Sequence, residues 1–356
     1  MKRLVLTFIS LLGVVLCASC TTMQAHVMAH QTAMGLHGLK SYRGTVTERG
    51  ILREQPQTLV VKQITYSRLW KVRAEVTAPK EHVGELFVFD GSTLSMWWPR
   101  YFFGLRIRGI EIPPKQQIDQ TILDSCYWAL ENYDYSNEGT TRMRGRSVRE
   151  WQGEPSEPRP FRYPYRAWLD GEFNLPLKVR VEKEPGRAWY EMVMGPIEFG
   201  VEVPGETFAF EFPESATVHD WDLQAPGVTL EEARKLVRFP LLVPNRLPPG
   251  HRIRKVIVSR NQETQMAALL MNKGAAWLSL SELPNMGPIL VPEVGIPVPV
   301  GDEEGVLNFV LGFTIVSWAV DGTALTLIGN IPYPELLQIA ASVKPAATPA
   351  AKEEQE

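Results

Sequence analysis

Apolar and polar residues alternate with a period of two in much of the chain between residues 41 and 213. The alternating segments are rich in aromatic and β-branched residues, and Gly, Pro and Asp separate them, as is typical of β-strands. The clearest unit covers residues 85–98, where Asp90-Gly91 is a strong signal for a tight hairpin turn. In its first strand both alternating sets are apolar, which indicates a sheet covered on both sides. The pattern predicts an antiparallel meander, whose last strand is expected at ETFAFEF, residues 206–212.

One long helix interrupts this β-rich region. In PPKQQIDQTILDSCYWALENY, residues 113–133, apolar residues recur at helical spacing around Cys126. We expect this helix to cover the concave side of the sheet, and we interpret Cys126 as a buried core thiol.

The pattern starts afresh after Pro226-Gly227. VTLEEARKLV predicts a helix in which Thr229 is the N-cap and Glu232, three residues later, completes a capping box. Strand-like segments, an Asp321-Gly322 hairpin signal and a closing helix over residues 334–343 follow. This order predicts a small α+β domain over residues 228–345, after a β-rich domain over residues 40–222. Residues 346–356 are polar and rich in Ala, and we expect them to be disordered.

The N-terminus has the order of a signal peptide. Lys2 and Arg3 precede a 13-residue apolar run, residues 4–16, and small residues precede Cys20. That run is shorter than the roughly 20 residues that a membrane-spanning helix needs. Ala18-Ser19-Cys20 resembles the bacterial lipobox, which implies that residues 1–20 are processed and that the Cys20 thiol carries a diacylglyceryl anchor of palmitate-like chains. The alternative is ordinary secretion with a free Cys20 thiol.

This interpretation predicts a protein at the cell membrane that faces the extracytoplasmic side, joined to its anchor by a short tether or helix over residues 21–39. About 336 residues remain after processing, which favours two domains. Cys126 is then the only cysteine left with a free thiol, so the fold cannot depend on an internal disulfide. A net charge of -3 argues against nucleic acid as the partner.

Two groups of polar residues are possible sites. His26, His30 and His37 fall on one side of a short helix, but no cysteine or acidic residue lies beside them in that stretch, so no metal or other cofactor is expected. Residues 142–166 hold seven arginines and three glutamates. Such a run is either solvated surface or a contact for anionic head groups or an acidic partner.

The order of segments resembles a known superfamily over about residues 35–222. SYRGTVTE, a strand ending in VTAP, GELFVFDGSTLSMWWP, RAWLDGEFNLPLKVRVE and IEFGVEVPGETFAFEFPESATV look like the LolA/LolB superfamily of lipoprotein carriers. They look most like its lipid-anchored LolA-like members in sporulating bacteria, and more distantly like the MucB/RseB regulators. The resemblance implies a curved, open antiparallel half-barrel with covering helices, and a space between sheet and helices that takes acyl chains.

Family carriers are soluble shuttles, whereas this chain carries its own predicted anchor, which favours reception, sensing or assembly at one membrane. The second domain, in which LVPNRLPPGH precedes a strand, resembles a small domain of undefined function in Gram-positive extracytoplasmic proteins.

The chain is not expected to be an enzyme, because it contains no GxSxG, HExxH, P-loop, GxGxxG or CxxC motif. Two classes of function remain open. One is a module that binds an acyl chain or the lipid of a lipoprotein, in envelope lipid handling or sensing. The other is a regulatory or structural protein that binds an envelope protein and holds no lipid.

Two sets of residues are candidates for ligand binding. The first is a strand face that meets either a helix or a ligand, although plain core packing explains it equally well: Leu86, Val88, Leu94, Met96 and Trp98. The second is an aromatic loop after Pro99, expected at the rim as a lip for lipid or a patch that dips into the membrane: Tyr101, Phe102 and Phe103.

Overall fold

A computed structural model describes residues 30–35, 37–52, 55–68, 70–112, 114–184, 187–260, 265–273, 276–284, 295–310 and 313–345. The chain divides into two units. The first comprises the described residues up to Gly104 together with Ile110–Thr217, and the second comprises Leu105–Gly109 and the described residues from Val218 onward. The division predicted at Pro226-Gly227 stays a prediction.

Within the described residues, twelve strands form one antiparallel sheet, with β12 and β7 at its two edges. The spatial order is β12-β6-β5-β4-β3-β2-β1-β11-β10-β9-β8-β7. Its strands are β1 (Ser41–Leu52), β2 (Gln55–Ser67), β3 (Lys71–Ala78), β4 (Leu86–Phe89), β5 (Leu94–Trp98), β6 (Phe103–Arg108), β7 (Tyr133–Met143), β8 (Arg146–Pro155), β9 (Tyr165–Asp170), β10 (Pro176–Glu184), β11 (Arg187–Phe199) and β12 (Thr217–Asp222).

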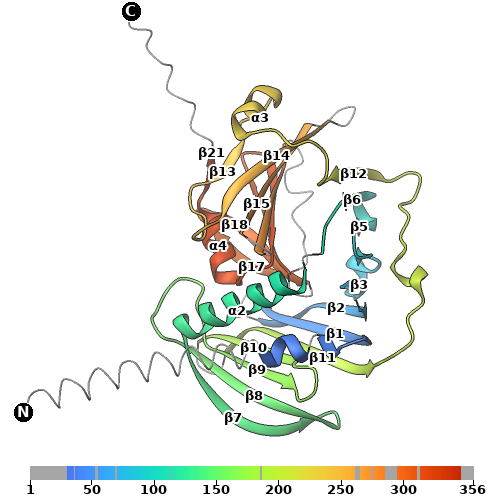
Figure 1. Ribbon diagram of the computed structural model, residues 1–356, viewed down its shortest axis with the longest axis vertical. Helices are drawn as coiled ribbons and strands as arrows, with labels where there is room; N and C mark the ends of the chain where they lie inside the picture. Colours follow the sequence, from blue (N-terminus) through green and yellow to red (C-terminus); the bar gives the residue numbers. More distant parts are fainter. Residues whose placement is uncertain are drawn as a thin grey trace, which may run out of the picture. The chain divides into compact units, whose positions relative to one another are not determined.

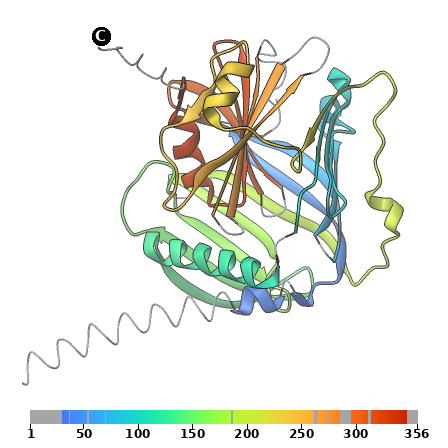
Figure 2. The ribbon, with the colours of Figure 1, turned by 45° about the horizontal axis from the view of Figure 1, so that its top comes forward.

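The strands of the first unit make two meanders, β1 to β5 and β7 to β11, which the pairing of β1 with β11 joins. These strands curve strongly and do not close into a barrel, as Figures 1 and 2 show. The predicted class, mainly antiparallel β with α and an open curved sheet, is confirmed.

The hairpin between β4 and β5 shows how local sequence sets this meander. Gly91 has a φ of 104°, a conformation that favours glycine. One Asp90 carboxylate oxygen accepts the backbone N–H groups of Ser92 at 2.8 Å and Thr93 at 2.7 Å. The Asp-Gly signal therefore marks the turn that the sequence predicts.

The predicted long helix is α2 (Lys115–Asn132), and it lies across the inner side of strands β7 to β10 (Figures 1 and 2). The Trp128 ring lies 6.0 Å from that of Tyr133, which begins β7. Cys126 is half-buried, not fully buried as expected, and its partial burial raises the pKa of its thiol.

An N-terminal helical segment covers a different part of the first unit. Residues 30–35 and 37–38 are helical, and residues 21–29 of the expected tether lie outside the described residues. A Cβ at Gly35 would lie 2.4 Å from the carbonyl oxygen of Phe173, so only glycine fits at this contact. The Asn174 side-chain amide donates to the carbonyl of Gln31 at 2.7 Å. His37 Nε2 lies 3.1 Å from a carboxylate oxygen of Asp119 in α2.

The second unit contains a seven-stranded antiparallel sheet among its described residues, in the order β14-β15-β16-β20-β19-β18-β17, and a short pair, β13 with β21. Its elements are α3 (Leu230–Leu236), β13 (Leu242–Pro244), β14 (Arg252–Arg260), β15 (Gln265–Lys273), β16 (Ala276–Leu283), β17 (Ile296–Val300), β18 (Glu303–Val310), β19 (Phe313–Val320), β20 (Thr323–Gly329), α4 (Tyr333–Ala341) and β21 (Val343–Pro345).

Three local predictions are confirmed in this unit. Thr229 and Glu232 form the reciprocal capping box of α3. Asp321 and Gly322 both have positive φ, at 47° and 79°, and connect β19 to β20. The closing helix is α4, although it ends at Ala341 and Val343 already begins β21.

The core of the second unit is a row of aliphatic side chains that runs across five strands. Strand register aligns these residues on one face of the sheet, and each is fully buried: Leu269, Leu280, Leu327, Val316 and Leu307. Tyr333 of α4 packs on the same face, because its ring lies 5.9 Å from that of Phe309. Glu282 lies on this apolar face as well, between Ala267 and Leu325 in the register.

Candidate functional site

The predicted face of the β4–β5 hairpin is in fact two faces. Leu86 pairs with Trp97, and Phe87 pairs with Met96. Residues that pair directly across antiparallel strands point to the same side of the sheet. Leu86 and Val88 therefore lie on one side, and Leu94, Met96 and Trp98 lie on the other. The expectation of a single shared face is wrong, because strand pairing decides which residues share a side.

The side with Leu86 and Val88 is filled by another part of the chain. Leu86, Val88 and Trp97 form a buried cluster with Phe208, which ends the short 3-10 helix η3 (Gly205–Phe208). The partly buried residues packed against this cluster are Val203, Phe210, Phe212 and Ala216. The expected strand over residues 206–212 is therefore wrong. Its alternating phenylalanines cover the face of the sheet and add no strand to its edge.

The three rim aromatics also separate. Tyr101 ends a short 3-10 helix, η2 (Pro99–Tyr101), and Phe103 begins β6 and is buried. Phe102 alone is exposed, at 57%, with a φ of 47° that is unusual for a bulky side chain. Val83, in a neighbouring turn, is 52% exposed. The predicted loop of three aromatics is thus one exposed aromatic beside an exposed valine.

A cavity of about 320 Å³ lies elsewhere in the first unit, between the β7–β8 turn and strands β10 and β11. None of the eight candidate residues lines it. Its lining is apolar apart from two arginines and consists of Met143, Arg144, Arg146, Leu177, Met194, Gly195, Pro196 and Ile197. Leu177 and Met194 are buried, at 3% and 4% exposure.

Two local irregularities shape this cavity. In the β7–β8 turn, Arg144 and Gly145 both have positive φ, at 50° and 82°, as in a two-residue hairpin loop. In β11, Gly195 and Pro196 together oppose one β1 residue, Thr45, because Gly44 pairs with Ile197 and Val46 with Met194. A Cβ at Gly195 would lie 3.2 Å from Thr45, so a larger side chain there would crowd the β1 backbone.

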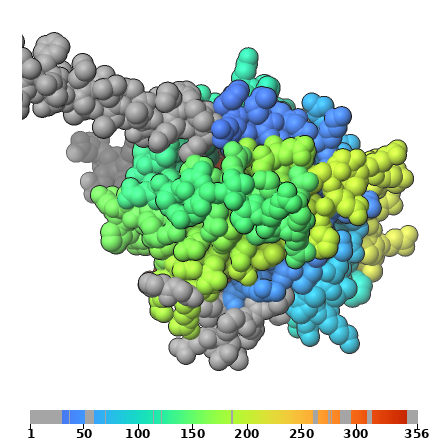
Figure 3. Space-filling view, turned by 90° about the horizontal axis from the view of Figure 1, so that it is seen from below, coloured from blue at the N-terminus to red at the C-terminus, as the bar shows by residue number. Residues whose placement is uncertain are grey.

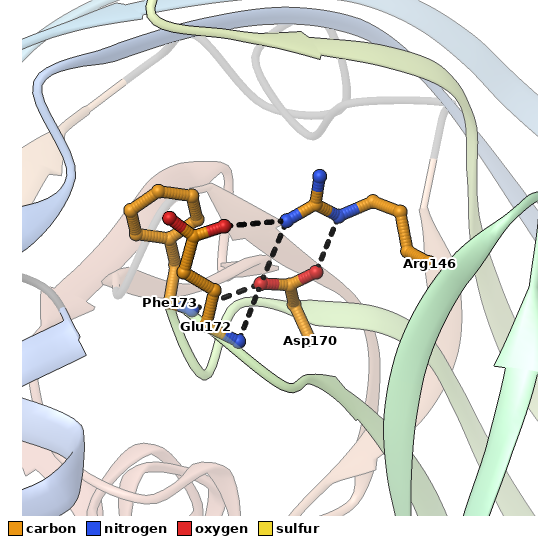
Figure 4. A network of polar contacts seen from close by, with 4 residues as sticks. All are labelled: Arg146, Asp170, Glu172 and Phe173. Carbon is orange, nitrogen blue, oxygen red and sulfur yellow. Dashed lines mark hydrogen bonds and ion pairs between the residues drawn. The ribbon is translucent and has the colours of Figure 1, made fainter.

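Arg146 is held in place by a network of polar contacts, shown in Figure 4. Its Nε lies 2.5 Å from one carboxylate oxygen of Asp170, and its NH2 nitrogen lies 3.2 Å from a carboxylate oxygen of Glu172. Asp170 also accepts the backbone N–H groups of Glu172 and Phe173. The Arg146 guanidinium lies 4.3 Å from the centre of the Phe199 ring. Its charge is therefore neutralised within the protein.

Asp170 is the electrostatic centre of this network. Burial by itself would raise the pKa of its carboxyl, but the hydrogen bonds from Arg146 and the two backbone N–H groups outweigh burial and lower that pKa. The hydrogen bonds to Asp170 likewise raise the pKa of Arg146. Both groups are charged at neutral pH, and the pair fixes the β7–β8 turn against the loop after β9.

The other arginines of residues 142–166 divide into two groups. Arg149, Arg159, Arg162 and Arg166 each contact a neighbouring side chain. In the described part of the chain, by contrast, no hydrogen bond or ion pair involves the side chain of Arg142 or Arg144. Arg144 is thus an exposed cation at an apolar cavity.

Figure 3 shows one face of the molecule, where green and yellow-green segments, which include the β7–β11 region, occupy the middle.

Other predicted sites have limited structural information. Cys20 and His26 lie outside the described residues. Among the residues that the structure describes, no group of three or more His, Cys, Asp or Glu side chains is placed to hold a metal ion. The described helices include none that is long and apolar enough to cross a membrane.

Sequence reasoning missed the cavity itself. Leu177, Met194 and Ile197 read as ordinary strand residues, and the pairing of β10 with β11 and the bulge in β11 bring them to one side of the sheet. Three dipeptides did carry a signal for local irregularity: Arg144-Gly145, Asp170-Gly171 and Gly195-Pro196. Arg144-Gly145 and Gly195-Pro196 mark the turn and the bulge that line the cavity, and Asp170-Gly171 marks the turn that binds Arg146.

No protein-family model matches this chain, and no curated protein matches it in sequence. The structure is similar to a crystal structure of MucB, with 16% identity and a TM-score of 0.48 over 91% of this chain and 98% of that chain. It is similar to the structure of the Pseudomonas aeruginosa MucA/MucB complex, with 17% identity and a TM-score of 0.42 over 91% and 100%.

A crystal structure of a LolA superfamily protein from Nitrosomonas europaea covers 52% of this chain and 97% of its own, with 10% identity and a TM-score of 0.25. At such identities a likeness concerns the arrangement of the backbone alone. MucB and LolA-like proteins are the groups that the order of segments in the sequence resembles.

Proposed function

We propose that this protein is a lipid-anchored extracytoplasmic protein whose first unit binds an apolar ligand, in envelope lipid or lipoprotein handling or sensing. The observation that carries the proposal is the cavity between the β7–β8 turn and strands β10 and β11. Its volume, about 320 Å³, falls at the lower end of the roughly 300–1,000 Å³ typical of ligand sites.

The chemistry of the lining suits an acyl chain. Met143, Leu177, Met194, Pro196 and Ile197 offer it carbon and sulfur atoms. Methionine side chains adapt to chains of different shape, because they are unbranched and flexible. The charge of Arg146 does not oppose such a ligand, since Asp170 and Glu172 neutralise it.

The anchor supports reception or sensing at one membrane more than shuttling between two. The described chain begins at His30, ten residues after Cys20. Ten residues span at most about 35 Å, so an acylated Cys20 would keep the first unit close to its membrane.

The test uses the full-length chain with Cys20→Ser, purified without detergent. Organic extraction followed by mass spectrometry should recover lipid bound to the protein, and Nile red, a neutral apolar dye, should bind with increased fluorescence. Ile197→Trp places a large ring at the cavity. It should weaken Nile red binding about tenfold or more, because the cavity has no room for the Trp ring and the dye together.

Val193→Trp is the matched control for this experiment. Val193 lies on the same strand and is also half-buried, but it points to the other side of the sheet and does not line the cavity. It should leave Nile red binding unchanged. If no lipid is extracted and Ile197→Trp binds the dye as wild type does, the cavity is not a ligand site.

A second candidate function is a regulatory or structural protein that binds an envelope protein and holds no lipid. The exposed pair Val83 and Phe102 favours it, since exposed apolar side chains on adjacent turns offer a contact surface. If wild type holds no lipid and Phe102→Ser loses an envelope protein that co-purifies with wild type, protein binding would be favoured over lipid binding.

A further inference from the structure

We infer, building on the proposed function, that the ligand of the cavity is an amphiphile with an anionic head group, and that Arg144 binds this head group. The inference rests on a contrast between the two arginines that line the cavity. Both lie at the same turn, yet among the described residues a counter-ion is found for Arg146 and not for Arg144.

Arg146 already has two carboxylates as counter-ions within the protein. Its Nε and NH2 nitrogens contact Asp170 and Glu172, and its guanidinium lies over the Phe199 ring. Removing it from Asp170 would leave a fully buried carboxylate without its cation, which is unfavourable. Arg146 is therefore structural, and it supports the turn that carries Arg144.

Arg144 is in the opposite situation. Its side chain is exposed at the cavity, and among the described residues no carboxylate is paired with it. The two acids nearest to the turn in the network, Asp170 and Glu172, are already bound by Arg146. Residues 142–146 hold three arginines, and the two carboxylates of this network are both bound by Arg146.

The conformation of the β7–β8 turn fixes the backbone position of Arg144 at the cavity. Two-residue hairpin loops with positive φ favour Asn-Gly or Asp-Gly, because those residues tolerate the left-handed conformation. Here arginine occupies the first position with a φ of 50°. The guanidinium fork then meets the head group of a chain whose tail lies along Met143 and Ile197.

The volume sets the size of the tail. If each heavy atom takes about the 30 Å³ that a water molecule occupies in the liquid, the cavity holds on the order of ten atoms. A single medium-length chain with a carboxylate or phosphate head fits this space. The shared chemistry is a tail with an anionic head, and the experiment separates the two kinds of head.

The experiment measures displacement of Nile red from the full-length chain with Cys20→Ser by three ligands with the same tail: decanoate, decyl phosphate and decanol. Wild type should prefer an anion over decanol by about three- to tenfold, as expected for a charge pair near the surface. Raising the salt concentration should reduce this preference. A preference for either anion supports the inference, and the stronger of the two identifies the head group.

Arg144→Gln should abolish the preference and leave decanol binding unchanged. Arg142→Gln is the matched control, because Arg142 is also exposed and unpaired among the described residues but does not line the cavity. It should keep the preference. Equal binding of decanoate, decyl phosphate and decanol by wild type, or an unchanged preference in Arg144→Gln, would overturn the inference while leaving the proposed function intact. Failure of wild type to bind decanol and Nile red would refute both.

Discussion

Glu282 provides a direct test of the packing of the second unit. It lies on β16, is fully buried, and one of its carboxylate oxygens, Oε2, accepts the backbone N–H of Leu242 in β13 at 2.9 Å. The other oxygen, Oε1, is buried and has no hydrogen-bond partner among the described residues. Burial raises the pKa of this carboxyl from 4.5 to about 8, and the Leu242 N–H offsets only part of that rise. At neutral pH Glu282 is therefore mostly protonated.

The perturbation is Glu282→Gln, which keeps the shape and the acceptor for Leu242 but cannot ionise. Between pH 4.5 and pH 8 the folded wild type binds more protons than the unfolded chain, so its stability falls as pH rises. The contribution is fully present below pH 4.5 and is lost as pH rises through about 8. At about 1.4 kcal/mol for each pH unit, the free energy of opening should fall by roughly 4 kcal/mol between pH 5 and pH 8.

The assay is hydrogen exchange of the peptide that contains β13, read as protection corrected for the intrinsic pH dependence of exchange. A local measurement suits a chain of two units, because its global unfolding need not be a single transition. Protection in wild type should fall with pH, whereas Glu282→Gln should show a flat profile and exceed wild type at pH 8. Glu231→Gln, an exposed glutamate in α3, is the control and should behave as wild type.

Two results would refute the reasoning. If wild-type protection is as flat as that of Glu282→Gln, the carboxyl is not held in its neutral form by burial. If Glu282→Gln is less protected than wild type at pH 8, the added amide costs more than the buried charge does.

Three further predictions concern the anchor, the rim and the arginine network. Cys20→Ser should release the protein from the membrane or leave it as uncleaved precursor, and detergent partitioning that matches wild type would exclude the lipoprotein interpretation. Phe103→Ser should lower the melting temperature through a loss of roughly 3 kcal/mol or more, because the ring is buried, while Phe102→Ser should change stability by less than about 1 kcal/mol. A similar loss in both variants would show that Phe102 is packed. Arg146→Gln should destabilise the first unit by about 1–3 kcal/mol, since buried Asp170 loses donors. Because the pKa of Asp170 is lowered from 3.8, this contribution to stability is present above pH 3.8 and is lost in stronger acid. The free energies of urea unfolding of wild type and Arg146→Gln should therefore become equal in strong acid. Arg142→Gln, the control, should have the stability of wild type at every pH.

Local patterns in the sequence determined the class of the fold and many of its turns. The Asp90-Gly91 and Asp321-Gly322 hairpins, the Thr229–Glu232 capping box and helix α2 all depend on residues a few positions apart. Conformational preference and hydrogen bonding over so short a distance are properties of the segment itself, and they persist in any fold that contains it. The same holds for the alternation that predicted antiparallel strands.

Tertiary structure alone decided which faces are shared and where the cavity lies. Alternation shows that Leu86 and Met96 belong to strands, but only the register Leu86 with Trp97 places them on opposite sides. The phenylalanines of residues 206–212 alternate as a strand does, yet they cover the sheet, because an exposed apolar face offers more burial than an edge does. The bulge at Gly195-Pro196, which lines the cavity, arises where β1 pairs with β11, some 150 residues later in the chain. Nothing local to either strand specifies that partner, since pairing is chosen by the summed burial and hydrogen bonding of the whole sheet.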